Sequence, residues 1–158
     1  IVQSMRTGGF AEFVLVHESQ CVTVPKTIPM ASASLLACGV ITGFGAVTNT
    51  AKVPAGSHVV VIGTGGVGLN AIQGARVSGA RTVIAIDIAD NKIAAAKDFG
   101  ATHGINSKTE NVAERVLELT DGRGADYVFV TVGVKSAFDS SYGMLAKSGA
   151  DRSIFPTR

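Results

Sequence analysis

The chain alternates between short apolar runs and longer amphipathic segments, most regularly between residues 58 and 132. Runs in which nearly every position is apolar are typical of strands buried on both faces, and the segments between them have helical spacing. Strands and helices in alternation form a parallel sheet that is covered by helices on both sides. The pattern therefore predicts an α/β fold with a doubly wound, Rossmann-type parallel sheet.

The predicted sheet is truncated. We expect strands over residues 58–62, 82–87, 103–105 and 127–132, and helices over 66–78, 90–99, 111–119 and 135–146. These are about four strands, whereas a complete doubly wound sheet usually has six. Residues 151–158 are charged and contain a proline, which favours an irregular tail over a fifth strand. We also expect the fourth strand to expose an unpaired edge, which favours association with another chain.

The residues before position 58 follow a different pattern. Apolar runs over 11–16 and 21–24 predict two strands, and prolines end this part of the chain. A helical stretch is expected from 30 to 38, and a second helical piece begins at Thr42. Since no run reaches the roughly 18 apolar residues that span a bilayer, we expect no membrane segment.

The residues that carry candidate chemistry begin where the first strand of the sheet ends. Residues 63–68 fit the pattern G-x-G-x-x-G after an apolar strand and before a helix. Gly63 permits a tight turn, Gly65 lets the backbone approach a pyrophosphate, and Gly68 lets the helix pack against the sheet. The amides and the positive end of the helix dipole then face the phosphates. The motif predicts a dinucleotide site.

A carboxylate ends the next predicted strand. Asp87 lies 19 positions after Gly68, close to the roughly 20 expected for an acid that binds the adenosine ribose. A 2′-phosphate would meet like charge there, so NAD is favoured over NADP. Lys92 is placed either to approach the same ribose or to be a solvated surface lysine. The alternative for Asp87 is a cap on the following helix, which the matched spacing of strand, loop and acid disfavours.

Composition narrows the class of protein. A formal net charge of +2 is too small to indicate nucleic acid or an anionic membrane as a partner. Cys21 and Cys38 form neither a disulfide framework nor a zinc quartet, which favours a reducing, cytoplasmic setting. The chain begins with neither methionine nor a signal peptide, and we expect it to be part of a longer protein.

In combination, these motifs resemble the zinc-containing medium-chain alcohol dehydrogenases. The resemblance covers about residues 8 to 150 and rests on the glycine loop, the strand end at 85–87, the opening at 9–13 and the run Ala37-Cys38-Gly39-Val40-Ile41-Thr42-Gly43-Phe44-Gly45. It implies that residues 1–40 are a remnant of a β-rich, GroES-like catalytic domain. Residues 41–150 would then be an incomplete NAD-binding Rossmann domain, followed by the tail at 151–158.

The resemblance also implies roles for single residues. Cys38 matches a ligand of the catalytic zinc and Thr42 a residue beside the nicotinamide, which makes these two the candidate catalytic residues. Asp87 and Lys92 match the ribose contacts. The pyrophosphate loop is matched by Gly63, Gly65, Gly66, Val67 and Gly68, and the backbone along the nicotinamide half by Thr131, Val132 and Gly133.

The chain departs from that family in several places. Two further ligands of the catalytic zinc, a four-cysteine structural zinc loop and the last two strands of the nucleotide domain have no counterpart here. A catalytic zinc site needs three protein ligands. We therefore expect zinc in a full-length parent and not in this chain alone.

Two functions fit the sequence. The first is a portion of an oxidoreductase that transfers hydride between a small alcohol or aldehyde and NAD, zinc-dependent and homo-oligomeric in the parent. The alternative is a non-catalytic nucleotide-binding module. Cys38 beside the Thr42-Gly43 pair favours the first, because a bare binding module has no need of a thiol there. The same cysteine disfavours a zinc-free reductase.

Overall fold

The computed structural model describes residues 9–153. The chain divides after Ser34 into two units, which are described separately below. The second unit contains nearly all of the regular structure and the whole predicted dinucleotide site.

The second unit is built on a parallel sheet with the strand order β3-β2-β1-β4-β5. Its strands are β1 (His58–Ile62), β2 (Thr82–Asp87), β3 (His103–Asn106), β4 (Ala125–Val130) and β5 (Leu145–Ser153). In the register of the sheet, Val59 lies between Val83 of β2 and Tyr127 of β4. The chain winds outward from β1 in both directions, which confirms the predicted Rossmann-type α/β class. In such sheets ligands bind beyond the carboxyl ends of the strands where the winding reverses.

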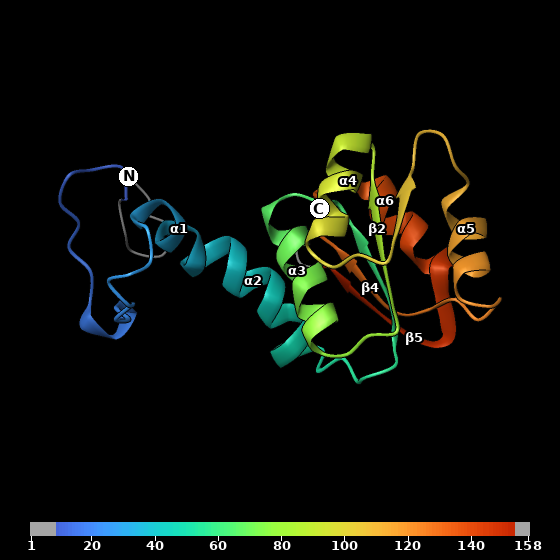
Figure 1. The fold of residues 1–158 in the computed structure, drawn as a ribbon, viewed down its shortest axis with the longest axis horizontal. Coiled ribbons are helices and arrows are strands. Elements are labelled where there is room, and N and C mark those ends of the chain that lie inside the picture. The colour runs from blue at the N-terminus through green and yellow to red at the C-terminus, as the bar shows by residue number, and fades with distance from the viewer. Residues whose placement is uncertain (1–8, 154–158) are drawn as a thin grey trace. The chain divides into compact units, whose positions relative to one another are not determined.

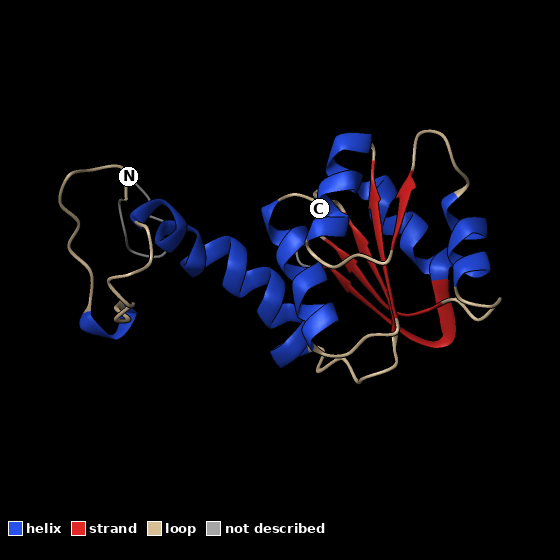
Figure 2. Cartoon of the chain, in the orientation of Figure 1, coloured by secondary structure: helices blue, strands red, loops and turns tan. Residues whose placement is uncertain are grey.

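Helices cover both faces of the sheet (Figures 1 and 2). They are α3 (Gly66–Val77), α4 (Asp90–Asp98), α5 (Val112–Leu119) and α6 (Lys135–Ser141), and the 3-10 turn η5 (Tyr142–Met144) leads into β5. Most of the predicted helix and strand boundaries differ from the observed ones by no more than two residues. Within this second unit, the exceptions lie in the last part of the chain.

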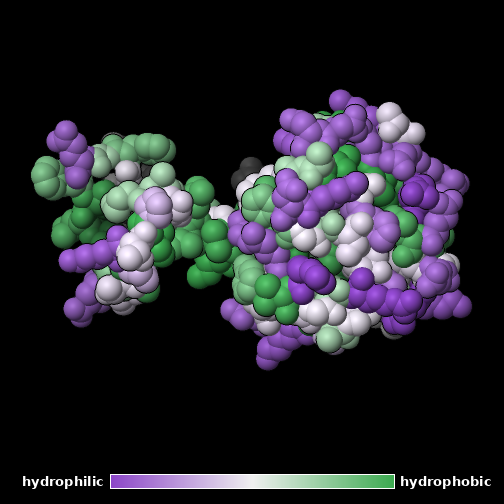
Figure 3. Space-filling view, in the orientation of Figure 1, coloured by the Kyte–Doolittle hydropathy of each residue, from purple (hydrophilic) through white to green (hydrophobic). Residues whose placement is uncertain are grey.

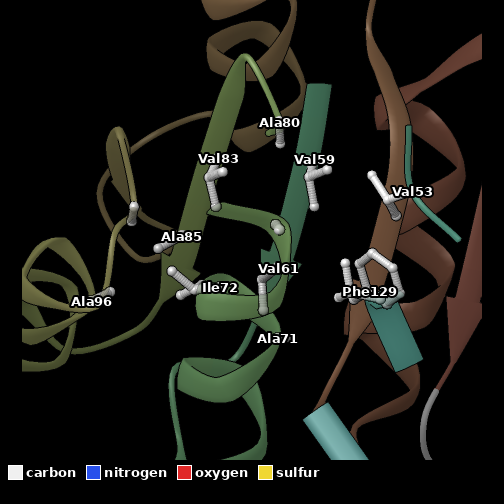
Figure 4. Close-up of a cluster of buried hydrophobic side chains, with 13 residues drawn as sticks. Val53, Val59, Val61, Ala71, Ile72, Ala80, Val83, Ala85, Ala96 and Phe129 are labelled. Carbon is white, nitrogen blue, oxygen red and sulfur yellow. The ribbon is translucent and has the colours of Figure 1, made fainter. Parts of the chain in front are cut away.

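Alternate residues of β1 enter two separate hydrophobic cores. All five residues of the strand are buried, as expected for a central strand. Val59 and Val61 point into a core with Ile72 of α3 and Ala96 of α4 (Figure 4). The residues between them enter the opposite core, which Val116 of α5 joins. Full burial of each large apolar side chain contributes about 1.5–3 kcal/mol, so the two cores fix β1 at the centre of the sheet.

The last part of the chain differs from the prediction. The helix predicted over 135–146 ends at Ser141, and β5 follows it as a fifth strand parallel to β4. Residues 151–153 of the predicted irregular tail therefore belong to the sheet, while residues 154–158 lie outside the described residues. Because β5 pairs with β4, the prediction that β4 exposes an unpaired edge was wrong.

Backbone pairing explains how a strand forms here without an apolar run. A Cβ at Gly149 would lie 2.6 Å from the carbonyl oxygen of Ala125, so the two backbones approach closely at this point. The ladder with β4 uses main-chain groups, and the tendency to form strands depends strongly on such context.

The two predicted N-terminal strands are absent from the described part of the first unit. Residues 11–16 and 21–24 pair with no strand, and between residue 9 and Met30 the only regular element is the 3-10 turn η2 (Glu18–Gln20). An extended segment needs a neighbouring strand to complete its hydrogen bonds. The large side chains of Phe10, Phe13 and Leu15 are at least 90% exposed, and Figure 3 shows hydrophobic residues gathered on this unit. The assignment of residues 1–40 to a catalytic-domain remnant stays a prediction, and residues 1–8 lie outside the described part.

Helical turns follow one another without a break over Met30–Thr50: α1 (Met30–Leu35), η3 (Leu36–Val40), α2 (Ile41–Gly45) and η4 (Ala46–Thr50). By length and composition this segment of 21 residues could cross a membrane. Sequence reasoning expected no such segment because it counted uninterrupted apolar runs, and here polar residues interrupt the run. One helix of this kind is weak evidence for a membrane, since core helices and signal sequences have the same composition.

Candidate functional site

Two glycines in the turn from β1 to α3 have no room for a side chain. Gly63 adopts a left-handed φ of +91°, and a Cβ there would overlap Cγ1 of Val132. A Cβ on Gly68 would overlap the carbonyl oxygen of Gly63. These two positions therefore hold the first turn of α3 directly against the end of β1.

The end of β4 is fastened to the same turn. The hydroxyl of Thr131 donates to the carbonyl oxygens of Ile62 and Gly63 at 3.0 and 2.7 Å, and its amide donates to Ile62 at 2.9 Å. By resemblance, Thr131 belongs to a stretch whose backbone lies along the nicotinamide half, which stays a prediction, and its side chain holds the turn. Val132 and Gly133 follow it beyond the strand end, and a Cβ on Gly133 would meet no atom within 4 Å.

The other two glycines of the turn lie in the open. Gly65 and Gly66 are exposed, and a Cβ at either would meet nothing within 4 Å. Gly65 is the N-cap residue of α3 and has no side chain to cap the helix. The first amides of a helix need partners from outside it, and the helix dipole favours an anion there. The turn therefore presents bare, positively polarised backbone beside Val67 in the first turn of α3.

Asp87 faces this turn from the end of β2. Its Oδ2 accepts hydrogen bonds from the Thr64 amide and the Thr64 hydroxyl, both at 2.9 Å, and its Oδ1 accepts one from the Ile88 amide at 2.8 Å. The carboxylate is half-buried. The acid predicted to contact the ribose thus bonds directly to the phosphate loop, and does not cap the helix that follows it.

Opposing influences act on the pKa of the Asp87 carboxyl. Burial, the largest of them, raises it, while the bonds from the Thr64 amide, the Thr64 hydroxyl and the Ile88 amide lower it. The positive charge of Lys92 lowers it further. Together the lowering influences win, so the pKa lies below its usual value and Asp87 is ionised at neutral pH.

A cavity of about 450 Å³ opens beside Asp87 at the carboxyl ends of the strands. Of the predicted site residues, Gly63, Asp87, Lys92 and Val132 line it. Its remaining lining residues come from strand ends, from the start of α5 and from α6 with the residue before it, namely Ile62, Ile86, Ile88, Ser107, Val112, Val134, Ser136, Ala137 and Ser140. An apolar cavity with one carboxylate at its edge suits a flat, mostly apolar group that carries hydroxyls.

Cys38 and Thr42 lie on a helical segment that packs against the glycine turn. A Cβ on Gly39 would lie 3.9 Å from Gly66, and one on Gly43 would overlap the carbonyl oxygen of Val67. Cys38 is exposed and Thr42 half-buried, and neither lines the cavity. The structure thus places this segment against the loop. It does not bring the side chain of Cys38 or Thr42 into the cavity beside Asp87.

Among the described residues, Cys38 is not part of a metal site. No group of three or more histidine, cysteine or acidic side chains lies close enough there to hold an ion. One exposed thiol falls short of the three protein ligands that a catalytic zinc requires. The residues that the structure describes, 9–153, therefore do not by themselves fit a catalytic zinc.

Comparison with known proteins assigns the arrangement to a family. A family profile described as zinc-binding dehydrogenase matches residues 66–150, more than half of the chain. The chain belongs to this family. A probable S-(hydroxymethyl)glutathione dehydrogenase of Schizosaccharomyces pombe is 45% identical over 134 residues, which cover 84% of this chain and 35% of that protein. Alcohol dehydrogenase-like 7 of Arabidopsis thaliana is 40% identical over 141 residues, which cover 87% and 36%.

Solved structures of zinc-binding dehydrogenases and their relatives share the fold. The benzyl alcohol dehydrogenase of Acinetobacter calcoaceticus matches with a TM-score of 0.81 and 35% identity, over 87% of this chain and 37% of that one. A quinone oxidoreductase of Pseudomonas syringae matches with a TM-score of 0.80 and 31% identity, over 88% and 42%. The chain spans little more than a third of the length of the curated relatives that it matches.

Sequence reasoning about this family member missed Thr64 and the helix starts that line the cavity. In G-x-G-x-x-G the second position is unspecified, so the motif gave Thr64 no role. Val112 and Ala137 lie at the starts of α5 and α6, and the parallel topology places such starts beside strand ends. The order of the elements was therefore the signal that could have found them.

Proposed function

We propose that this chain is the NAD-binding portion of an oxidoreductase that transfers hydride between an alcohol or aldehyde and NAD. One observation carries the proposal: an ionised Asp87 is bonded to a loop whose exposed glycines leave the start of α3 bare. Membership of the zinc-binding dehydrogenase family supports hydride transfer as the chemistry. The alcohol dehydrogenases among its relatives support a small alcohol or aldehyde as the substrate.

Different residues of the chain would bind different parts of the cofactor. Amides at the start of α3, reached across Gly65 and Gly66, suit the pyrophosphate. Asp87 suits a hydroxyl of the adenosine ribose, and the cavity beside it suits the adenine ring. Lys92 lies at the edge of this cavity, where it supports the ionised state of Asp87. The bound nicotinamide supplies the hydride acceptor or donor.

The same carboxylate disfavours the binding of NADP. A 2′-phosphate would bring a second negative charge next to an ionised Asp87 inside a partly apolar cavity, where charges are poorly screened. Lys92 alone does not offset that repulsion, because its charge already faces Asp87. We therefore propose a preference for NAD.

Zinc belongs only to the proposal for a longer parent protein. There Cys38 is the candidate ligand, with its remaining partners supplied from outside this chain. The purified chain should hold far less than one zinc per molecule in elemental analysis. Stoichiometric, tightly held zinc would show that the chain itself supplies a complete ligand set.

For the parent we also propose a homo-oligomer. We further propose a reducing cytoplasm as its compartment, which the two free cysteines Cys21 and Cys38 support.

Binding of NAD and NADP to the purified chain tests the cofactor proposal. Replacing Asp87 by Ala should weaken NAD by about tenfold or more, since hydrogen bonds to a charged group contribute about 1.5–3 kcal/mol. The affinity for NADP should change little or improve. Asp98→Ala is the matched control, because Asp98 is an exposed acid at the far end of α4. Equal losses for the two cofactors would contradict the ribose assignment, and a wild-type chain that binds neither would contradict the proposal itself.

A further inference from the structure

Both hydrogen-bond donors of the loop residue Thr64, its amide and its hydroxyl, bond to Asp87. Its side chain is buried, with 3% of the residue exposed, although it lies between glycines in a surface turn. Its amide and its hydroxyl donate to the same oxygen, Asp87 Oδ2, at 2.9 Å each.

We infer that Thr64 is a positioning residue, whose hydroxyl fixes the Asp87 carboxylate against the phosphate loop and so orients it for the ribose. The inference rests on the proposed function and deepens it, because it assigns the preference for NAD to two residues. Asp87 supplies the charge, and Thr64 sets where that charge lies.

The count of acceptor sites on the carboxylate supports this role. An ionised carboxylate offers about four lone-pair sites, two on each oxygen. Thr64 occupies both sites on Oδ2, and the Ile88 amide occupies one on Oδ1. The remaining site lies on Oδ1, so a ribose hydroxyl is received by one defined oxygen. Without the Thr64 hydroxyl, the carboxylate gains a free site and rotates more easily.

The charged groups around Asp87 lower its pKa less than the bonds from Thr64 do. Among the described residues that line the cavity, Lys92 of α4 is the one other charged side chain, and it is exposed. Asp90 of the same helix accepts a hydrogen bond from the side-chain amide of Asn106. Burial alone would raise the pKa of Asp87, and the bonds from Thr64 are the largest influences that lower it.

The test measures the titration of Asp87 in the cofactor-free chain. Carbon-13 NMR of the carboxyl group gives its midpoint in wild type, Thr64→Val and Thr64→Ser. Valine matches threonine in shape without the hydroxyl, so the midpoint should rise in Thr64→Val and return to the wild-type value in Thr64→Ser. Thr48→Val is the matched control, because the Thr48 hydroxyl bonds to the carbonyl oxygen of Phe44 in a distant helical turn. An unchanged midpoint in Thr64→Val overturns the inference.

A second measurement needs no substitution of a buried residue. In the wild-type chain the amide proton of Thr64 should shift with pH and report the midpoint of Asp87, because that proton bonds to the carboxylate. A Thr64 amide that does not respond to this titration overturns the inference, even where Thr64→Val fails to fold.

Cofactor binding then separates this inference from the proposed function. NAD affinity at neutral pH should fall roughly three- to tenfold in Thr64→Val, and its loss on acidification should begin at a higher pH than in wild type. A merely structural role for Thr64 would lower affinity equally at all pH values. A wild-type chain that does not bind NAD contradicts the proposed function and leaves the Asp87 titrations to decide the positioning role.

Discussion

The glycine turn contains two pairs of glycines, one closely packed and one open to solvent. At Gly63 and Gly68 a Cβ would overlap backbone or side-chain atoms, whereas at Gly65 and Gly66 it would meet nothing within 4 Å. The first pair joins β1 to α3 at close range, and the second leaves a surface free. A single motif therefore combines a requirement of the fold with a requirement of the ligand, and substitution should separate the two.

The largest effect is expected at the packed pair, from Gly68→Ala. The new Cβ would overlap the carbonyl oxygen of Gly63, and only movement of α3 away from the sheet relieves that contact. We expect a loss of about 3 kcal/mol or more in the free energy of unfolding, measured by urea denaturation. Gly143→Ala is the control, because a Cβ there meets no atom within 4 Å. A loss below about 1 kcal/mol would show that the pair is not closely packed.

Gly63→Ala should cost somewhat less and should divide into two causes. The left-handed φ of +91° costs about 1–2 kcal/mol for alanine, and the overlap with Val132 adds to it. In the double variant with Val132→Ala, the overlap is relieved while the backbone strain stays. The two changes should therefore be less destabilising together than the sum of each alone, by about 1 kcal/mol in a double-mutant cycle. Strict additivity would refute the contact between these positions.

At the open pair, substitution should affect the ligand and spare the fold. Gly65→Val places a branched side chain over the bare start of α3, where the pyrophosphate is proposed to bind. We expect NAD affinity to fall about tenfold or more while the free energy of unfolding changes by less than about 1 kcal/mol. Calorimetric titration with NAD and urea denaturation measure the two quantities, with Gly143→Val as the control. Destabilisation as large as that of Gly68→Ala would remove the distinction between the pairs.

The packed pair, Gly63 and Gly68, could be predicted from the sequence because the motif that identifies it is local. The motif at 63–68 stands between an apolar strand and a helix, and the observed β1 and α3 begin at the predicted residues. The central strands were predicted equally well, since Val59 to Ile62 are apolar on both faces and must be buried.

Elements that depend on distant partners were harder to predict. β5 has no apolar run, and it exists because the edge of β4 supplies main-chain partners. Residues 11–16 have the apolar run but no partner strand among the described residues. The bond from Thr64 to Asp87 joins positions 23 residues apart, and no spacing rule predicts which side chain fills the unspecified place in the motif.

The smallest expected effect concerns Asp87, whose partner Thr64 lies between the packed and the open glycines. Because its folded pKa is lowered, Asp87 stabilises the native state at pH values above the unfolded pKa of about 3.9. That contribution is lost as the pH falls through the folded pKa. The stability difference between wild type and Asp87→Asn should thus be largest near neutral pH and shrink below about pH 4, in urea denaturation at pH 6, 4 and 3. Asp98→Asn, at an exposed site, is the matched control. A constant difference for Asp87→Asn would mean that the carboxylate is not held in its charged form by the turn, and Asp87 would then belong with the open glycines as a group that matters only to the ligand.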